Sequence, residues 1–173
     1  MTKTLATALP LTLTLITLLT GCGGDNDDPA PPSTQTATTA PNPTAALKRE
    51  ARSALSENRR LSIYVLWNNK IPAWSTHSTR GPALDSLRTA AQNRRKRGIR
   101  VYVLKDERRV VSLQLDPSYL RATATVVDEQ RLQPSRRNGS PLGRVVSLNE
   151  KARYVLRRIG RTNRFVVWNV VVQ

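Results

Sequence analysis

The only histidine is the first residue of this sequence that could do chemistry. His77 lies between Trp74 and Asp85 in a Ser/Thr-rich connector, and a histidine close to a carboxylate is a combination that general acid–base catalysts use. One hypothesis is therefore an enzyme in which His77 and Asp85 are polar groups of a cavity. The alternative is that His77 is an ordinary polar residue of a loop.

Two acidic doublets are the next candidates, Asp106-Glu107 and Asp128-Glu129. Paired carboxylates can divide acid and base roles. Adjacent side chains of a strand, however, point to opposite faces of the sheet. We therefore interpret both doublets as charged residues of turns and strand ends and not as a joint acid–base site.

Motifs of known catalytic chemistry are missing from the sequence. It has no His-rich metal spacing, no Gly-rich phosphate loop and no Gly-x-Ser-x-Gly element. We expect a protein that is not an enzyme, with no catalytic residue, no metal and no cofactor. The candidates for contact with a partner or small ligand are Trp74, His77 and Tyr102.

The only cysteine, Cys22, closes the sequence Leu19-Thr20-Gly21-Cys22. The apolar run before it, Leu5 to Leu19, is shorter than the roughly 20 residues that span a bilayer, and its length is typical of an export signal. The pattern resembles a bacterial lipoprotein signal. The resemblance implies cleavage before Cys22, acylation of its thiol, and a lipid-anchored position in the bacterial cell envelope, outside the cytoplasm. A buried N-terminal helix is the alternative, but four threonines in the run disfavour it.

Residues 22–46 are expected to be a disordered tether behind that anchor. The segment contains five prolines among Thr, Ala and Ser and cannot bury enough apolar area to offset the entropy of ordering. Its reach is roughly 25 Å as a coil or about 75 Å as extended polyproline. The chain thus divides into a signal (1–21), the lipidated Cys22 with its tether (22–46), and one domain (47–173).

The domain is strongly basic. The whole chain has 28 Lys and Arg against 12 Asp and Glu, and because residues 1–46 hold only Lys3 and three aspartates, residues 47–173 carry 27 bases and nine acids. Such a surface attracts anionic lipid, polymer or nucleic acid. Nucleic acid is disfavoured because the chain is expected to be exported and shows no aromatic stacking platform. The candidates for an anionic partner form two runs, Arg94, Arg95, Lys96 and Arg97, and Arg136 and Arg137; a merely solvated surface is the alternative.

Apolar spacing predicts two helices followed by an antiparallel meander. Spacings of three and four favour helices over 44–69 and 81–98, and a period of two then favours five strands, with a long loop over 131–146. The small residues Ala122 and Ala124 on one strand would let a helix lie close to the sheet. The expected fold class is α+β, with two N-terminal helices packed on a strongly curved, cone-like sheet. The five predicted strands are Ile99–Leu104, Arg108–Leu115, Tyr119–Glu129, Ser147–Arg158 and Arg164–Val172.

The strand sequences carry a family resemblance. Arg121 to Glu129, with its Ala-x-Ala and closing Glu, is followed by Arg153-Tyr154-Val155-Leu156 and by Trp168-x-Val170. Over about Gly81 to Gln173 this resembles the IMS domain that ends the chloroplast-division scaffold proteins, within the nuclear-transport-factor-2-like superfamily. The resemblance implies a non-enzymatic domain outside a membrane that binds the tail of a partner. This sequence lacks the DnaJ-like region, helical repeats and membrane span of those scaffolds, so a division role is not implied.

The leading hypothesis is therefore a lipid-anchored, non-catalytic binding or scaffold module for a protein partner or small ligand. Two alternatives stay open. One is a cavity enzyme that uses His77, and the other is a binder of anionic lipid or polymer through the basic surface.

Overall fold

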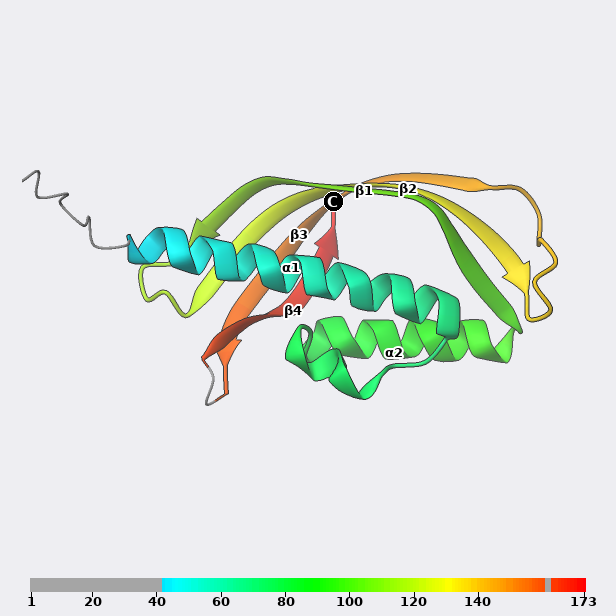
Figure 1. Ribbon diagram of the computed structural model, residues 1–173, viewed down its shortest axis with the longest axis horizontal. Helices are drawn as coiled ribbons and strands as arrows, with labels where there is room; N and C mark the ends of the chain where they lie inside the picture. Colours follow the sequence, from blue (N-terminus) through cyan, green and yellow to red (C-terminus); the bar gives the residue numbers. More distant parts are fainter. Residues whose placement is uncertain (1–41, 161–162) are drawn as a thin grey trace, which may run out of the picture. The chain divides into compact units, whose positions relative to one another are not determined.

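The computed structural model describes residues 42–160 and 163–173. The predicted signal, Cys22 and most of the predicted tether lie outside these residues. The described chain forms two long helices, a short 3-10 helix and four strands, so the predicted α+β fold class is confirmed (Figure 1). In chain order the elements are α1 (Pro43–Asn68), η1 (Ala73–His77), α2 (Gly81–Lys96), β1 (Ile99–Leu115), β2 (Arg121–Arg136), β3 (Val146–Ile159) and β4 (Arg164–Val172).

Helix α1 has a local signal at each end. The side chain of Asn42 accepts a hydrogen bond from the Thr44 amide at 2.9 Å, and Pro43 occupies the first turn, where a missing N–H costs nothing. At the other end Asn69 adopts a left-handed conformation, and its N–H donates to the Val65 carbonyl at 3.0 Å. The helix thus begins within the last residues of the predicted tether. No helix in residues 42–160 or 163–173 combines the length and the apolar character needed to span a bilayer.

The sheet is an antiparallel meander in the order β1-β2-β3-β4 and curves over α1 (Figure 1). The prediction of five strands was wrong, because the first two are one 17-residue strand, β1. The doublet Asp106-Glu107 is not a turn, and its residues pair with Gln130 and Glu129. Two bulges, near residues 104 and 111, let β1 bend without breaking the ladder.

The long loop predicted over residues 131–146 is also shorter than expected. Strand β2 continues to Arg136 because its last residues pair with the first residues of β1, with Ile99 opposite Arg136. The connection to β3 therefore covers only residues 137–145.

Two apolar clusters hold the helices to the sheet. In the first, Ala51, Ala54 and Leu55 of α1 pack with Ala122 and Ala124 of β2. This confirms that the small residues on β2 admit a helix at close range. The second cluster joins α1 to α2 through Leu61, Val65, Leu84 and Ala91. All of these residues lie within 42–173, so we expect that segment to fold on its own.

Polar groups cover the first part of the free edge of β4. The Glu50 carboxylate accepts from the Phe165 amide at 2.7 Å, and the Ser78 carbonyl accepts from the Val167 amide at 2.8 Å. The Arg80 amide donates to the Val167 carbonyl at 2.9 Å. An edge satisfied in this way cannot recruit a foreign strand there, and these contacts fix the segment containing η1 between α1 and β4.

Candidate anion-binding site

Basic residues from four parts of the chain meet at one end of the sheet. The C-terminal ends of α1 and α2, the first residues of β1 and the segment after β2 converge there, at the right of Figure 1. Between them lies a pocket of about 330 Å³. Among the described residues, its lining contains four cations and no carboxylate: Lys70, Arg95, Arg100 and Arg137, with Asn68, Asn69, Gly98 and Ile99 completing the wall.

Backbone geometry explains why residues far apart in sequence meet here. Gly98 has φ +66°, which favours glycine, and its N–H donates to the Arg95 carbonyl at 3.2 Å. The chain can therefore reverse from α2 directly into β1. The pairing of Ile99 with Arg136 then brings the end of β2, and with it Arg137, beside the start of β1.

Arg94 belongs to the predicted basic run, but its side chain makes hydrogen bonds within the protein. Its Nε donates to Asn69 Oδ1 at 3.0 Å and its Nη2 to the Val65 carbonyl at 3.3 Å. These bonds satisfy the C-terminal end of α1 and tie it to α2. Burial lowers the pKa of Arg94 from its ordinary value. Arg94 is thus a structural residue that holds α1 to α2 beside the pocket, whereas Arg95 and Arg137 line the pocket itself.

The pocket cations carry unneutralised charge. The three chain segments that build this end, 58–84, 86–105 and 130–149, contain no Asp or Glu. Within residues 42–160 and 163–173, none of the four pocket cations forms an ion pair. Three further cations of the predicted runs, Lys96, Arg97 and Arg136, are exposed at the same end. An arrangement of this kind attracts and holds an anion.

The candidates for a partner or ligand are only partly brought together. Trp74 and His77 line a second pocket of about 310 Å³ with Glu57 and Arg60, and the Trp74 ring packs edge-on against Tyr64 with centroids 6.0 Å apart. Tyr102 lies elsewhere.

Tyr102 packs edge-on against Trp67, with ring centroids 4.1 Å apart. Asp85 forms an ion pair with Arg88 at 2.9 Å, its side chain is 67% exposed, and it lines a different hollow from His77. The geometry thus gives no support to a catalytic pair of His77 and Asp85.

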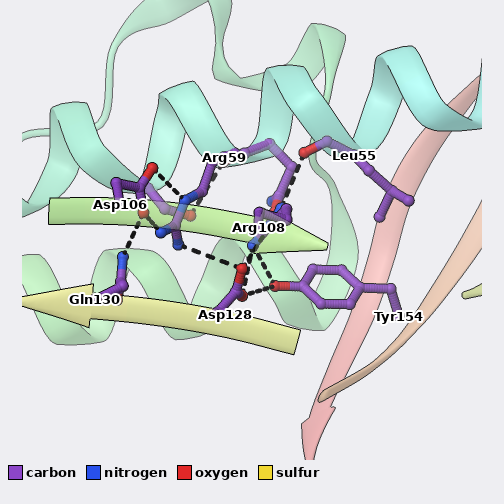
Figure 2. Close-up of polar contacts among 9 residues, drawn as sticks. Leu55, Arg59, Asp106, Arg108, Asp128, Gln130 and Tyr154 are labelled. Atoms are coloured by element: carbon purple, nitrogen blue, oxygen red, sulfur yellow. Dashed lines mark hydrogen bonds and ion pairs between the residues drawn. The ribbon is translucent and has the colours of Figure 1, made fainter. Parts of the chain in front are cut away.

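A buried charge network that the sequence did not predict joins α1 to the sheet. On the concave face of the sheet Arg108 donates to both oxygens of Asp128, at 2.7 and 2.9 Å, and also to the Tyr154 hydroxyl at 2.6 Å (Figure 2). The same guanidinium reaches the Leu55 carbonyl of α1 at 3.1 Å. A neighbouring pair, Arg59 and Asp106, joins α1 to β1. The network therefore links α1 to three strands.

The interpretation of the acidic doublets needs correction. Asp128 is buried and Glu129 is exposed, so the prediction that neighbours face opposite ways holds. The view that both doublets are only turn and strand-end charges was wrong, because Asp106 and Asp128 both pair with arginines. A signal was available, since Asp128 continues the inward alternation of Ala122, Ala124 and Val126.

Comparison with known proteins gives a likeness of fold. The chain is similar to the intermembrane space region of the chloroplast protein ARC6. That crystal structure matches with a TM-score of 0.58 and 14% identity, over 72% of this chain and 95% of that one. No family model and no curated protein matches. At this identity the likeness establishes the fold alone, and it confirms the expected resemblance at that level.

Two further solved structures, both from Catenulispora acidiphila, match more distantly. One, in complex with S-DNPA, has a TM-score of 0.41 and 14% identity, covering 74% of this chain and 92% of that one. The other has a TM-score of 0.40 and 15% identity, covering 76% and 93%.

Tyr154 predicts a pH dependence of stability. Burial raises the pKa of its phenol above the ordinary value of about 10, against the opposing effect of the Arg108 charge. A raised folded-state pKa contributes stability below about pH 10 that is lost as pH rises beyond it. We expect the free energy of unfolding to fall more steeply above pH 10 in the parent than in Tyr154→Phe, measured by denaturant titration at several pH values. Tyr119→Phe, which changes an exposed tyrosine, should follow the parent, and parallel curves for all three would contradict the assignment.

Proposed function

We propose that this chain is a non-catalytic binding module of the bacterial cell envelope, anchored through acylated Cys22, that holds an anionic envelope component at its cationic end. The observation that carries the proposal is the convergence of Lys70, Arg95, Arg100 and Arg137 on one pocket lined by no carboxylate. Within residues 42–160 and 163–173, no nucleophile or acid–base pair lines that pocket, and this supports binding rather than catalysis. The separation of His77 from Asp85 points the same way.

The proposed anchor and the cationic end are compatible in reach. Helix α1 has 26 residues and is therefore about 39 Å long, with the tether at its first turn and the pocket near its last. The 20 residues between Cys22 and Pro43 would span about 60 Å as extended polyproline. A domain held in this way can turn its cationic end back to the membrane that holds its anchor or present it to a component further out.

Co-sedimentation with vesicles tests the proposal. We expect residues 42–173 to bind vesicles rich in phosphatidylglycerol at low salt and to leave phosphatidylcholine vesicles unbound. Because the Debye length shrinks from about 10 Å at 0.1 M to about 3 Å at 1 M salt, the affinity should fall by about tenfold or more over that range. No binding to the anionic vesicles at low salt, or binding that ignores salt, would contradict the proposal.

A further inference from the structure

We propose that the cationic pocket is a specific site for a terminal phosphate group, such as that of a phosphomonoester or a diphosphate. This inference rests on the proposed function and narrows it, because a basic surface could attract any anion without a defined site. The ligand is defined by its chemistry and is either a free phosphate compound or the headgroup of a lipid.

The chemistry of the donors favours phosphate. Three of the four cations are arginines, Arg95, Arg100 and Arg137. The planar guanidinium presents two parallel N–H groups that match two oxygens of one phosphate. The fourth cation, Lys70, adds a compact charge. They come from four separate parts of the chain: Arg95 from α2, Arg100 from β1, Lys70 from the connection after α1 and Arg137 from the connection after β2.

The size of the pocket favours a compact ligand. The pocket has a volume of about 330 Å³. This is room for a phosphate group and the ester or second phosphate attached to it. A long polymer would have to cross the pocket instead of entering it.

Hydrogen bonds behind the pocket hold its supporting elements together. Arg94 binds Asn69 and the Val65 carbonyl, and the Asn69 side-chain amide donates to the Ile99 carbonyl at 2.5 Å. These bonds tie the end of α1 to both α2 and β1. The backbone around the pocket is thus held before a ligand enters, whereas the exposed side chains of Lys70, Arg95 and Arg137 become ordered on binding.

Charge separates two kinds of phosphate. A phosphomonoester carries about −1.5 to −2 at neutral pH and has three free oxygens, whereas the diester of phosphatidylglycerol carries a single charge and has two free oxygens. Four cations with no carboxylate among the lining residues should therefore prefer the monoester. A surface that binds anions only through its average charge would bind the monoester and the diester equally when the two are presented at the same surface charge density.

The test titrates the full chain in neutral maltoside micelles, so that the anchor is the same in every arm. The probes are pyrophosphate, short-chain phosphatidic acid, and short-chain phosphatidylglycerol at the mole fraction that gives equal micelle charge, all at constant ionic strength. Calorimetry should show that pyrophosphate, phosphatidic acid or both bind about tenfold tighter than phosphatidylglycerol. Binding of pyrophosphate alone would assign a free phosphate compound, and binding of phosphatidic acid alone a lipid headgroup; both results support the site.

Variants locate the binding. Arg95→Gln with Arg137→Gln should lower the affinity for the bound probe about tenfold or more, since each change removes a charged hydrogen-bond donor. The matched control, Arg52→Gln with Arg153→Gln, removes two exposed arginines outside the pocket and should stay within about twofold. Equal binding of phosphatidic acid and phosphatidylglycerol without pyrophosphate binding, or an unchanged affinity in the pocket variant, would overturn the inference. In that case, salt-sensitive binding to phosphatidylglycerol vesicles would still support the proposed function. Absence of both vesicle binding and phosphate-probe binding would contradict the proposed function as well.

Discussion

Replacing Asp128 with alanine should be among the most damaging single changes in the domain. The change removes the carboxylate that Arg108 holds with two hydrogen bonds and leaves that guanidinium, whose side chain is only 12% exposed, without its counter-ion. Breaking a buried ion pair at one partner costs about 3–5 kcal/mol. We expect the free energy of unfolding in urea to fall by about that amount and the Tm to fall by more than about 8 °C.

The neighbouring residue provides the control for this change. Glu129→Ala removes the same charge from the same strand, but Glu129 is exposed, so the free energy of unfolding should change by less than about 0.5 kcal/mol. A double change, Arg108→Met with Asp128→Leu, replaces the pair by apolar side chains and should be less damaging than Asp128→Ala. Equal stability of Asp128→Ala and Glu129→Ala would show that the network does not hold α1 to the sheet.

Gly81→Ala is the second change with a large expected effect. Gly81 opens α2 at φ +56°, and a Cβ there would lie 2.8 Å from Cε2 of Trp168. The left-handed conformation alone costs about 1–2 kcal/mol for a residue with a side chain, and the overlap adds to it. Moving Trp168 away would disturb its contact with the Arg157 guanidinium, which lies 4.5 Å from the ring centroid. We expect a total loss of about 2–4 kcal/mol in a urea titration.

Gly98→Ala separates the cost of the left-handed backbone conformation from the cost of the overlap with Trp168. Gly98 has a similar positive φ, +66°, but in the described part of the chain an added Cβ would meet nothing within 4 Å beyond its own chain neighbours. Its substitution should therefore show only the conformational cost of about 1–2 kcal/mol. If the two variants were equally stable, the contact between Gly81 and Trp168 would have no energetic role.

The helices could be predicted closely because their signals are local. The spacing of apolar residues predicted 44–69 and 81–98, and the structure has Pro43–Asn68 and Gly81–Lys96. Caps such as Asn42 and the left-handed Asn69 act within a few residues of the helix ends. The α+β plan followed from the change of period after Gly98.

The continuous strand β1 could not be predicted in this way. Asp106 and Glu107 have the composition of a turn, and the partner that keeps Asp106 in the strand region is Arg59, 47 residues earlier. The pairing of two distant charges leaves no local pattern. The same holds for Arg108, because nothing in the sequence distinguishes one buried arginine among 27 basic residues.

The candidate site could be predicted in part, less fully than the helices but better than the continuous strand β1. Both basic runs were visible, but their convergence depends on the pairing of Ile99 with Arg136. The different roles of Arg94 and Arg95 depend on helical phase. Arg94 follows Leu84, Leu87 and Ala91 at spacings of three and four, so this phase already indicated that Arg94 faces inward.

Matched charge reversal tests the central claim, that binding is located at the cationic end, most directly. Arg95→Glu with Arg137→Glu and Arg52→Glu with Arg153→Glu change the net charge of residues 42–173 equally, but only the first pair lies in the pocket. Affinity for phosphatidylglycerol vesicles at 0.1 M salt is the quantity to measure, since each basic residue near an anionic surface contributes about 1 kcal/mol. We predict that the pocket variant loses at least about ten times more affinity than the control variant. Equal losses in the two variants would mean that the total charge of the domain, and not this end of it, determines binding.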